Sequence, residues 1–437
     1  IVSSTDISND ALVDLGSFTS IGTELYDAYL MQYSTSTEAS SLGLLETLNE
    51  RIKTTSNPLL LQYEDIFPKV RTMGEYRKGG KTRIELLMSD ADFFVPLVRI
   101  DLLERDGKAL PHTWEDLVGL VQFYNGTDLN DDGDASGDYG LCIYPRGGGS
   151  GSRRFAKNGA NDGAFIPKLM YSTWASVDQT QGIQQGFFFD DVYFTPRIGN
   201  GFAYAMNIWK ELWDYSADAG CDGDGSLASM FMQGRCAVGY APPGCWKDLF
   251  IGSDDGEGEG GVAWRNQTDG SILHDANSGK ALWRPRMADG SYAEPYRLKP
   301  FGSLKVINRK TDEFEDCAPN TCPRSERISH PTSLPTDDRA GILVESSHVD
   351  QLINRVPFYW SGGYGNGIRK SADPVVKDMM WDFFVYVNSP ITSVDDVILP
   401  SMLDSWRYSQ LASYERNYVK GGWSYGAWNE HQKVVLW

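Results

Sequence analysis

An acidic loop carries the side chains with the clearest capacity for chemistry in this 437-residue sequence. Oxygen-bearing side chains recur there at alternate positions around Gly133, and they belong to Asp128, Asn130, Asp132, Asp134 and Asp138. A calcium-binding EF-hand loop begins in this way, because carboxylate and amide oxygens surround the ion while a glycine permits the sharp turn. Tyr139 replaces the usual bidentate glutamate, and no second helix pattern follows. We therefore predict a bound structural Ca²⁺ outside an EF-hand, and the alternative is a solvated acidic turn.

Motifs of catalysis are weak in this sequence. The run from Gly422 to Gly426 has the letters of a hydrolase nucleophile elbow, but an elbow needs an acid and a histidine on separate loops downstream. Only Glu430 and His431 remain after it, so the match is a chance one. Two nearby carboxylates such as Asp90 and Asp92 could serve a glycoside hydrolase, which needs a pair about 5 to 10 Å apart. We expect no enzyme, and a secreted glycoside hydrolase is the less favoured alternative.

Six cysteines indicate disulfide bonds, because none of them stands in the Cys-x-x-Cys spacing of zinc and redox sites. The predicted pairs, in order of preference, are Cys317 with Cys322, Cys221 with Cys236, and Cys142 with Cys245. The first closes a tight local loop, the second flanks a helix–strand unit, and the third is what remains, since spacing does not fix connectivity. Asn125 and Asn266 are acceptor sites for N-linked glycans. Together these features favour an extracellular glycoprotein.

The net charge of the chain limits the classes of partner that it can bind. Its 59 acidic and 40 basic residues give a formal net charge of -19, which disfavours binding to nucleic acid or anionic lipid. No apolar run approaches the roughly 18 to 20 residues that a membrane helix needs. The sequence opens on Ile1 without a basic and apolar leader, so we expect any targeting peptide to lie outside it. Its length suggests about two to three compact units.

Hydrophobic spacing predicts an alternation of helices and strands. The helices are expected at 113–124, 202–215, 226–232 and between Asp373 and Pro390, and the strands at 26–32, 83–88, 93–100 and 236–240. Thr113 and Asp116 have the spacing of a capping box, and Pro374 suits the first turn of a helix. The last helix has a predicted buried face of Val376, Met379, Met380, Phe383, Phe384 and Val387. This alternation is typical of α/β layering with a mainly parallel sheet.

A series of short motifs follows in one order along the chain. They are Gly80-Lys81, Asp90-Ala91-Asp92, Arg99 to Leu102, His112 to Asp116, Asp128 to Gly140, Phe231 to Val238, Gly244-Cys245-Trp246 and Gly362 to Ile368. In this order they resemble the bacterial extracellular solute-binding proteins of the maltose-binding-like kind, over most of residues 1–410. Ala91 stands where that family has a glycine. Residues 263–355 depart from the bacterial pattern and, with their extra cysteines, are more similar to solute-binding domains of large eukaryotic algal or protist proteins.

The resemblance implies the α/β, two-lobed periplasmic-binding-protein type 2 fold, in which the lobes close on a ligand in the cleft between them. Lobe 1 would begin with residues 1–100, without the family's first strand, and return at 363–390. Lobe 2 would span 112–357 with an insertion at about 263–355, and residues 391–437 would pack across the lobes. The chain would cross between lobes at about 93–112 and 358–368.

The same resemblance implies a ligand site of acidic, aromatic and glycine residues. Its expected members are Asp90, Asp92, Trp246, Tyr359, Trp360, Gly363 and Tyr364. Aromatic rings stack on the C–H faces of sugars while carboxylates accept hydrogen bonds from hydroxyl groups, and the same groups would suit a cation. Glycines beside Trp246 and Trp360 favour an exposed cleft, and the alternative for each ring is a place in the core.

We therefore expect extracellular binding or sensing of a small polar solute, a carbohydrate first and a polyamine or other cation second. The alternative is a structural or interaction module in a larger cell-surface assembly, whose other domains or subunits would be its partners.

Overall fold

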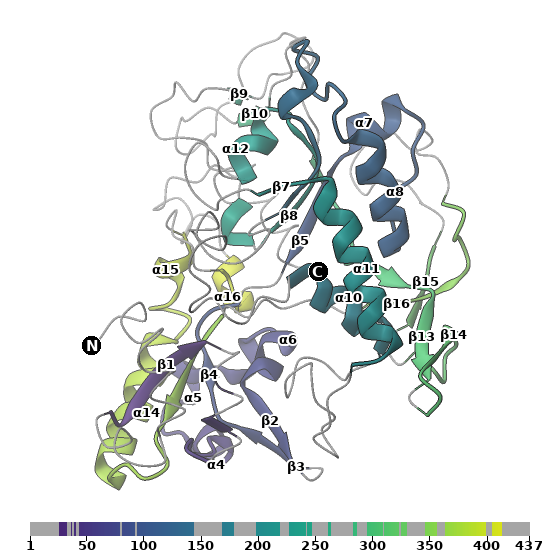
Figure 1. Cartoon of the computed structure of the whole chain (residues 1–437). Helices are drawn as coiled ribbons and strands as arrows, with labels where there is room; N and C mark the ends of the chain where they lie inside the picture. The colour runs from purple at the N-terminus through teal and green to yellow at the C-terminus, as the bar shows by residue number, and fades with distance from the viewer. Residues whose placement is uncertain are drawn as a thin grey trace, which may run out of the picture. The chain divides into compact units, whose positions relative to one another are not determined.

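The computed structural model describes residues 26–143 apart from 33–35, 37–38, 41–42, 79–80 and 92–93. Further along the chain it describes 168–178, 198–218, 227–241, 243–246, 261–263, 283–285, 295–308, 310–322, 325–329, 346–355, 363–398 and 404–412. These residues form two compact units (Figure 1). The first contains the described residues up to Ala91 and from Gly363 onward, and the second those from Phe94 to Arg355. The strand expected at 26–32 is present at 28–32, while residues 1–25 lie outside the described range.

The first unit is built on a sheet whose middle strand comes from late in the chain. Its strands are β1 (Ala28–Gln32), β17 (Tyr364–Ile368) and β4 (Leu87–Met88), and β17 runs antiparallel to both neighbours. Glycines let Leu86 lie against β17, because an added Cβ would lie 2.8 Å from this side chain at Gly365 and 2.9 Å at Gly367. The hairpin of β2 (Glu75–Lys78) and β3 (Lys81–Ile84) completes the strands described in this unit.

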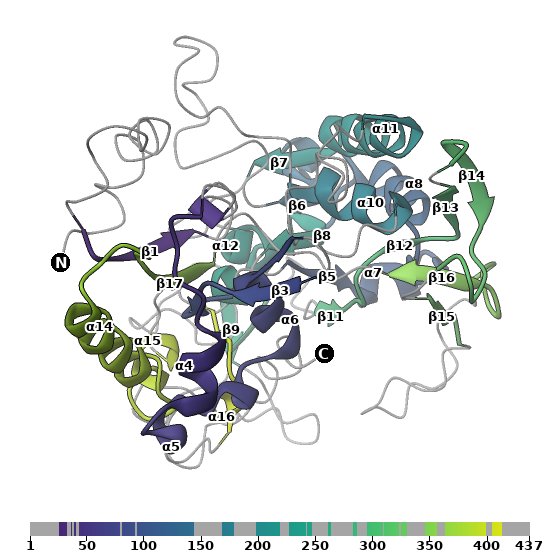
Figure 2. The ribbon, with the colours of Figure 1, turned by 90° about the horizontal axis from the view of Figure 1, so that it is seen from below.

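Helices of the first unit pack on this sheet and on one another (Figure 2). They are α4 (Asn49–Thr54), α5 (Pro58–Leu61), α6 (Pro68–Arg71), α14 (Pro374–Val387), α15 (Val394–Ile398) and α16 (Tyr408–Leu411), with 3₁₀ turns η2 (Tyr63–Asp65) and η3 (Thr72–Gly74). Residues 391–398 and 404–412 belong to this unit, and the rest of 391–437 lies outside the described residues.

The start of α14 is as predicted, but its buried face is not. Asp373 caps the helix by accepting a 2.8 Å hydrogen bond from the Val375 backbone N–H, and Pro374 occupies the first turn. The buried side chains are Trp381, Phe384 and Val385, whereas Met379 and Phe383 are 65% and 44% exposed. The prediction of a buried stripe is therefore wrong at Met379 and Phe383, confirmed at Phe384, and only partly met at Val376, Met380 and Val387, which are half-buried. Apolar residues surround most of this helix, so spacing alone does not select the face that packs on β17 and α5.

The second unit contains a five-stranded sheet. Its strands in spatial order are β11 (Pro295–Arg297), β5 (Val95–Arg99), β8 (Cys236–Ala241), β6 (Tyr139–Ile143) and β7 (Ser216–Asp218). β6 runs parallel to β8 and β7, while β5 runs antiparallel to β8 and β11. Across the described sheets antiparallel pairs outnumber parallel ones, so the prediction of a mainly parallel sheet is wrong. Apolar spacing predicts that a strand is buried but carries no information about its direction.

Helices flank this sheet, and three of them confirm the predictions at 113–124, 202–215 and 226–232. They are α7 (Ile100–Arg105), α8 (Trp114–Tyr124), α10 (Lys168–Asp178), α11 (Asn200–Asp214) and α12 (Leu227–Met232), with 3₁₀ turns η4 (Ala135–Gly137) and η6 (Pro243–Trp246). The capping box of α8 is present: Thr113 Oγ1 accepts a 3.0 Å hydrogen bond from the Asp116 N–H, and Asp116 Oδ2 accepts one of 2.9 Å from the Thr113 N–H. The structure is an α/β protein whose largest described sheet is mixed.

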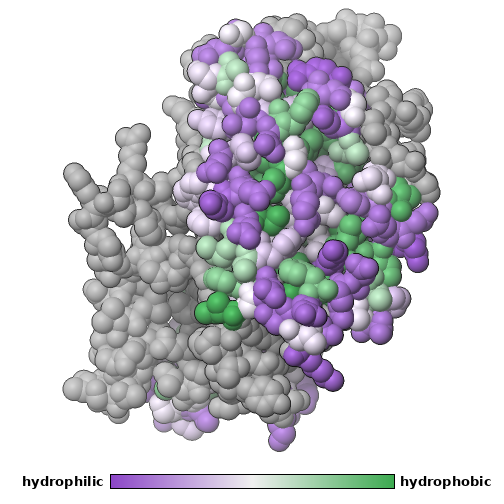
Figure 3. Space-filling model, turned by 45° about the vertical axis from the view of Figure 1, so that its right-hand side comes forward, coloured by the Kyte–Doolittle hydropathy of each residue, from purple (hydrophilic) through white to green (hydrophobic). Residues whose placement is uncertain are grey.

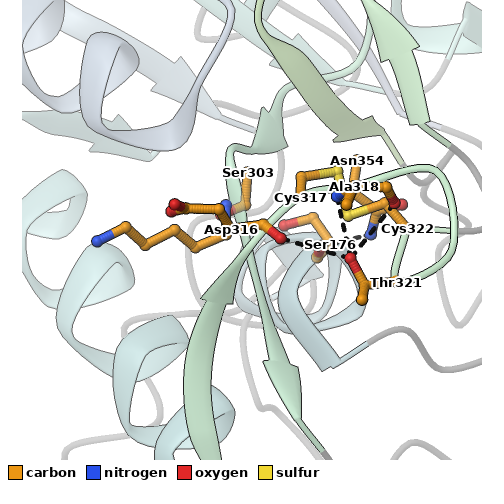
Figure 4. Close-up of a disulfide and its surroundings, with 9 residues drawn as sticks. Ser176, Ser303, Asp316, Cys317, Ala318, Thr321, Cys322 and Asn354 are labelled. Atoms are coloured by element: carbon orange, nitrogen blue, oxygen red, sulfur yellow. Dashed lines mark hydrogen bonds between the residues drawn. A yellow bond between two sulfur atoms is a disulfide. The ribbon is translucent and has the colours of Figure 1, made fainter.

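The predicted insertion supplies short antiparallel strands to the second unit. They are β9 (Gly261–Ala263), β10 (Trp283–Pro285), β12 (Gly302–Ser303), β13 (Lys305–Asn308), β14 (Glu313–Asp316), β15 (Ser325–Arg327) and β16 (Leu352–Arg355). The Cys317–Cys322 disulfide follows β14 and is confirmed (Figure 4). Beside it, Asn354 of β16 donates a 2.6 Å hydrogen bond to the Ser176 carbonyl in α10. The disulfide thus closes a turn next to a strand that is tied to a core helix.

The other two predicted disulfides are wrong. Cys142 of β6 is bonded to Cys236 of β8, a residue 94 positions later in the sequence. The two strands are neighbours in the sheet, so their order in space decides the pairing. Cys245 is also disulfide-bonded, and Cys221 lies outside the described residues.

Most of the described face in Figure 3 is hydrophilic, with smaller hydrophobic areas between. Among the described residues, no helix is long and apolar enough to span a membrane.

A buried arginine, Arg355, lies beside His112, and this contact determines how acid affects the stability of the protein. Arg355 is 6% exposed and donates from Nε to Glu326 Oε1 at 2.7 Å, while its Nη2 lies 2.8 Å from His112 Nδ1. Neutral His112 can accept from this donor, but a protonated ring would present a second donor. Burial and then Arg355 lower the pKa of His112 to about 4, while Asp116 and Glu326 raise it and His348 lowers it further.

We expect acid to destabilise the protein through this histidine. In the unfolded chain His112 binds its proton below about pH 6.5, whereas in the folded chain it does so only near pH 4. The free energy of unfolding should therefore fall by about 2–3 kcal/mol between these two pH values on account of His112. Urea unfolding at pH 7 and pH 4.5 measures the loss, and His112→Gln, whose amide oxygen can still accept from Arg355, should reduce it. Equal losses in both proteins would contradict this assignment.

Candidate functional site

The predicted turn after β4 uses its first carboxylate to hold the backbone. Asp90 is 2% exposed, and its Oδ1 accepts hydrogen bonds from the N–H groups of Ala91 at 2.9 Å and Asp404 at 3.0 Å. Ser89 donates to the Tyr364 carbonyl from its backbone N–H at 2.8 Å and from its hydroxyl at 3.1 Å. The structure therefore brings Asp90 close to the start of β17 and to the segment that begins at Asp404.

Two of the other predicted ligand residues also lie at this edge of the first unit. Gly363 is buried with φ +78°, a left-handed conformation that favours glycine. Tyr364 follows it as the first residue of β17 and is half-buried. Asp92, Tyr359 and Trp360 lie outside the described residues. Among the described residues of the predicted ligand site, Asp90, Gly363 and Tyr364 lie close to one another.

Trp246 lies in the core of the second unit instead. Its side chain is 0% exposed, and its indole Nε1 donates to the Val95 carbonyl at 3.2 Å. The ring meets Phe231 edge-on at 5.4 Å and covers Gly239, where an added Cβ would lie 2.3 Å from Trp246 Cη2. The expectation that the Trp246 ring is exposed in a cleft is therefore wrong. A glycine does lie close to the ring, but this glycine is Gly239, and the contact is inside the core.

Sequence reasoning missed a segment with several buried polar side chains, Asp404 to Arg407. Asp404, Ser405, Trp406 and Arg407 are each at most 1% exposed. Within the described part of the chain, three kinds of donor here have no hydrogen-bond partner: the Ser405 hydroxyl, the Trp406 indole Nε1, and Nε and Nη2 of Arg407. A buried donor without a partner costs about 1–3 kcal/mol. Such groups can recover this cost by binding the oxygen atoms of a ligand.

The backbone of this segment is fixed by its neighbours. The Phe67 N–H donates to the Trp406 carbonyl at 2.9 Å, and Gln410 Oε1 accepts from the N–H groups of Trp406 at 2.9 Å and Arg407 at 3.0 Å. Arg407 Nη1 donates to the Gln62 carbonyl at 3.0 Å and lies 3.6 Å from Asp65 Oδ2. Burial lowers the pKa of Arg407 to about 10, against the opposing effect of Asp65. Arg407 is therefore still a cation at neutral pH.

The predicted calcium loop is held by hydrogen bonds within itself. Asp128 accepts from the N–H groups of Asp132 and Gly133, Asp132 from that of Asp134, and Asp134 from that of Ser136. Asn130 donates to Asp132, and Asp138 accepts from the Leu129 N–H at 2.7 Å. Burial raises the pKa of Asp138, with Asp132 and Asp128 acting in the same direction against Leu129 and Arg235. In the described ranges no group of three or more His, Cys, Asp or Glu side chains is arranged to hold a metal ion, and the calcium hypothesis stays a prediction.

The predicted glycan sites are placed only in part. Asn125 caps the C-terminus of α8 and is half-buried, while Asn266 lies outside the described residues. Glycosylation stays a prediction.

Comparison with solved structures defines the fold. A ribitol-bound ABC-transporter solute-binding protein from Agrobacterium radiobacter K84 matches 98% of this chain and 76% of its own, with a TM-score of 0.51 and 14% identity. Maltose-bound MalE3 from T. maritima matches 98% and 76%, with a TM-score of 0.47 and 13% identity. No protein-family profile matches the sequence, and neither does any curated protein sequence. The chain therefore has the two-lobed α/β fold of ABC-transporter solute-binding proteins, and the ribitol-bound protein is the particular structure that carries this conclusion.

Proposed function

We propose that this protein binds a small polar solute, a carbohydrate or polyol first and a polyamine second, without converting it. The fold supports this proposal, because the ribitol-bound protein that shares it is a transporter's binding component. The observation that carries it is the set of buried donors at Ser405, Trp406 and Arg407, in the segment that Asp90 holds. Hydroxyl and ring oxygens of a sugar accept hydrogen bonds from donors of these kinds.

We also propose an extracellular location, supported by the disulfides Cys142–Cys236 and Cys317–Cys322. The Cys317–Cys322 bond within residues 263–355 supports the further proposal of a eukaryotic-type variant with extra cysteines. Whether Ca²⁺ and glycans are bound belongs to the same proposal and rests on the sequence of the acidic loop and of the two acceptor sites.

A structural or interaction module is the second candidate, because α14 exposes a row of apolar side chains. Val375, Met379 and Tyr386 are 67%, 65% and 58% exposed, and Phe383 lies on the same side of the helix. Exposed apolar groups in a row are typical of surfaces that contact another protein. Partners would then be other domains or subunits of a larger surface protein.

Calorimetric titration with ribitol, maltose and spermidine tests the first proposal. Saturable binding with the probe recovered unchanged supports solute capture. Release of glucose from maltose would instead support a glycoside hydrolase, and the absence of binding to all three would favour the interaction module.

Trp406→Phe should separate binding from stability. The change removes an indole donor that has no partner in the described residues, so we expect the best-binding probe to lose about ten-fold in affinity, the effect of one hydrogen bond. Trp114→Phe is the matched control, because its Nε1 already donates to Ser176 Oγ at 2.9 Å. The control should lose more thermal stability than Trp406→Phe and keep the affinity of the native protein. Equal affinities in the two variants would remove Trp406 from the site.

A further inference from the structure

A basic pocket lies in the first unit, away from the segment at Asp404 in the sequence and formed by other elements. Its cavity volume is about 410 Å³, and its lining comes from the loop before α4, from α4 itself, from β3, from the turn between β17 and α14, and from α14. Its lining residues are Leu45, Glu46, Thr47, Arg51, Arg83, Lys370, Pro374, Lys377 and Asp378. In both ribbon views α4 lies between α14 and β3 (Figures 1 and 2).

The pocket is positive although the protein is strongly acidic. Four cationic side chains line it, from Arg51, Arg83, Lys370 and Lys377, against the two carboxylates of Glu46 and Asp378. The whole chain carries a formal net charge of -19, so cations gathered in one pocket oppose the average field of the molecule. A local excess of positive charge attracts and binds anions.

Two of the cations are held in place by the pocket's own acids. Glu46 accepts from Arg51 Nε at 2.7 Å through Oε1 and contacts Lys377 Nζ at 2.8 Å through Oε2. Arg51 Nη1 also donates to Asp378 Oδ1 at 2.8 Å. These contacts consume both carboxylates of the lining and fix the positions of Arg51 and Lys377. The acids therefore build the pocket and leave it with unused positive charge.

The other two cations keep donors available. Arg83 Nε contacts Glu85 Oε1 at 3.0 Å, and its guanidinium lies over the Tyr76 ring, 5.2 Å from the centroid. These contacts orient the guanidinium, and its two Nη groups make no hydrogen bond to another residue of the described ranges. Lys370 is anchored by its backbone N–H, which donates to the Leu44 carbonyl at 2.8 Å. Its exposed ammonium forms no close ion pair in the same ranges and acts on the Glu85 carboxylate only from a longer distance.

We propose that this pocket binds a tetrahedral oxyanion, the phosphate or sulfate group of a small ligand. The two Nη groups of Arg83 form a planar fork that matches two oxygens of such a group, and Lys370 supplies a point charge for a third. Arg51 and Lys377 add positive charge to the lining. This site is independent of the solute site at Ser405 to Arg407, because no residue contributes to both.

Isothermal titration of the full chain with inorganic phosphate and with inorganic sulfate, in dilute chloride buffer, tests the proposal. We expect saturable binding of at least one of them, and the preferred anion identifies whether a phosphate or a sulfate group is the natural ligand. Lys370→Gln should weaken binding about ten-fold, equivalent to about 1.4 kcal/mol. Added sodium chloride should weaken binding further, since exposed charges are screened.

The matched control is Lys53→Gln. Lys53 belongs to α4 and contacts Glu50, but it does not line the pocket, so the variant carries the same change in net charge. Its affinity for phosphate and sulfate should equal that of the native protein. Failure of the native chain to bind either anion, or equal affinities in Lys370→Gln and Lys53→Gln, would overturn the proposal. Neither result depends on whether a sugar binds at the other site.

Discussion

Replacing Trp246 with alanine will lower the free energy of unfolding by about 3–5 kcal/mol, the usual cost of removing a large aromatic ring from a core. The ring is 0% exposed, meets Phe231 edge-on, and covers the backbone of Gly239 in β8. Its loss also leaves the Val95 carbonyl of β5 without the indole donor at 3.2 Å. Chemical denaturation of the two proteins in parallel measures the difference.

Trp209→Ala provides the control for this change. Trp209 is only half-buried on α11, where it meets Trp213 at 5.3 Å, so its removal should cost much less stability. The opposite result would be a Trp246 variant that unfolds at the same denaturant concentration as the native protein but has lost affinity for a solute. It would show that Trp246 belongs to the binding site rather than to the core.

Asp65→Asn will destabilise the first unit by about 3 kcal/mol, because it removes the counter-charge of a fully buried cation. Arg407 is 0% exposed and lies 3.6 Å from Asp65 Oδ2. Asparagine keeps the size of the side chain and an oxygen that can accept the 2.9 Å hydrogen bond from the Ser409 N–H. The Ser409 hydroxyl, which donates to Asp65 Oδ2, can turn to accept from the new amide N–H. The expected loss therefore reports the charge rather than the packing, and urea unfolding at neutral pH measures it.

Adding Arg407→Met to this variant should restore part of the lost stability, since an apolar side chain needs no counter-charge. The sign of this second step is the critical result. If the double variant were less stable than Asp65→Asn by the full effect of Arg407→Met alone, the two groups would be uncoupled and the ion pair would have no role.

Local signals in the sequence predicted local structure well. The capping box at Thr113 and Asp116 depends on residues three positions apart, and the start of α14 depends on Pro374 in its first turn. The short Cys317–Cys322 loop could be predicted for the same reason. Each of these features is decided by neighbours along the chain, without reference to the rest of the fold.

Features decided by distant segments could not be predicted in this way. The Cys142–Cys236 bond follows from the adjacency of β6 and β8, and the exposure of Met379 follows from which side of α14 faces β17. At the candidate site, the grouping of Asp90 with Tyr364 was expected from the family resemblance. Ser405 to Arg407 match no sequence motif. They are recognised only in the structure, by buried donors that have no hydrogen-bond partner among the described residues.

The place of β17 between β1 and β4 has a consequence for biosynthesis. β1 and β4 are synthesised before β17, and both remain unpaired while the ribosome adds the residues from Met88 to Tyr364. At about 5–20 residues per second this takes roughly ten seconds to a minute. During this time the nascent chain exposes two strand edges that can pair with other molecules. We expect translation to make this protein a client of chaperones that bind extended segments, until residue 368 has emerged and the sheet can close.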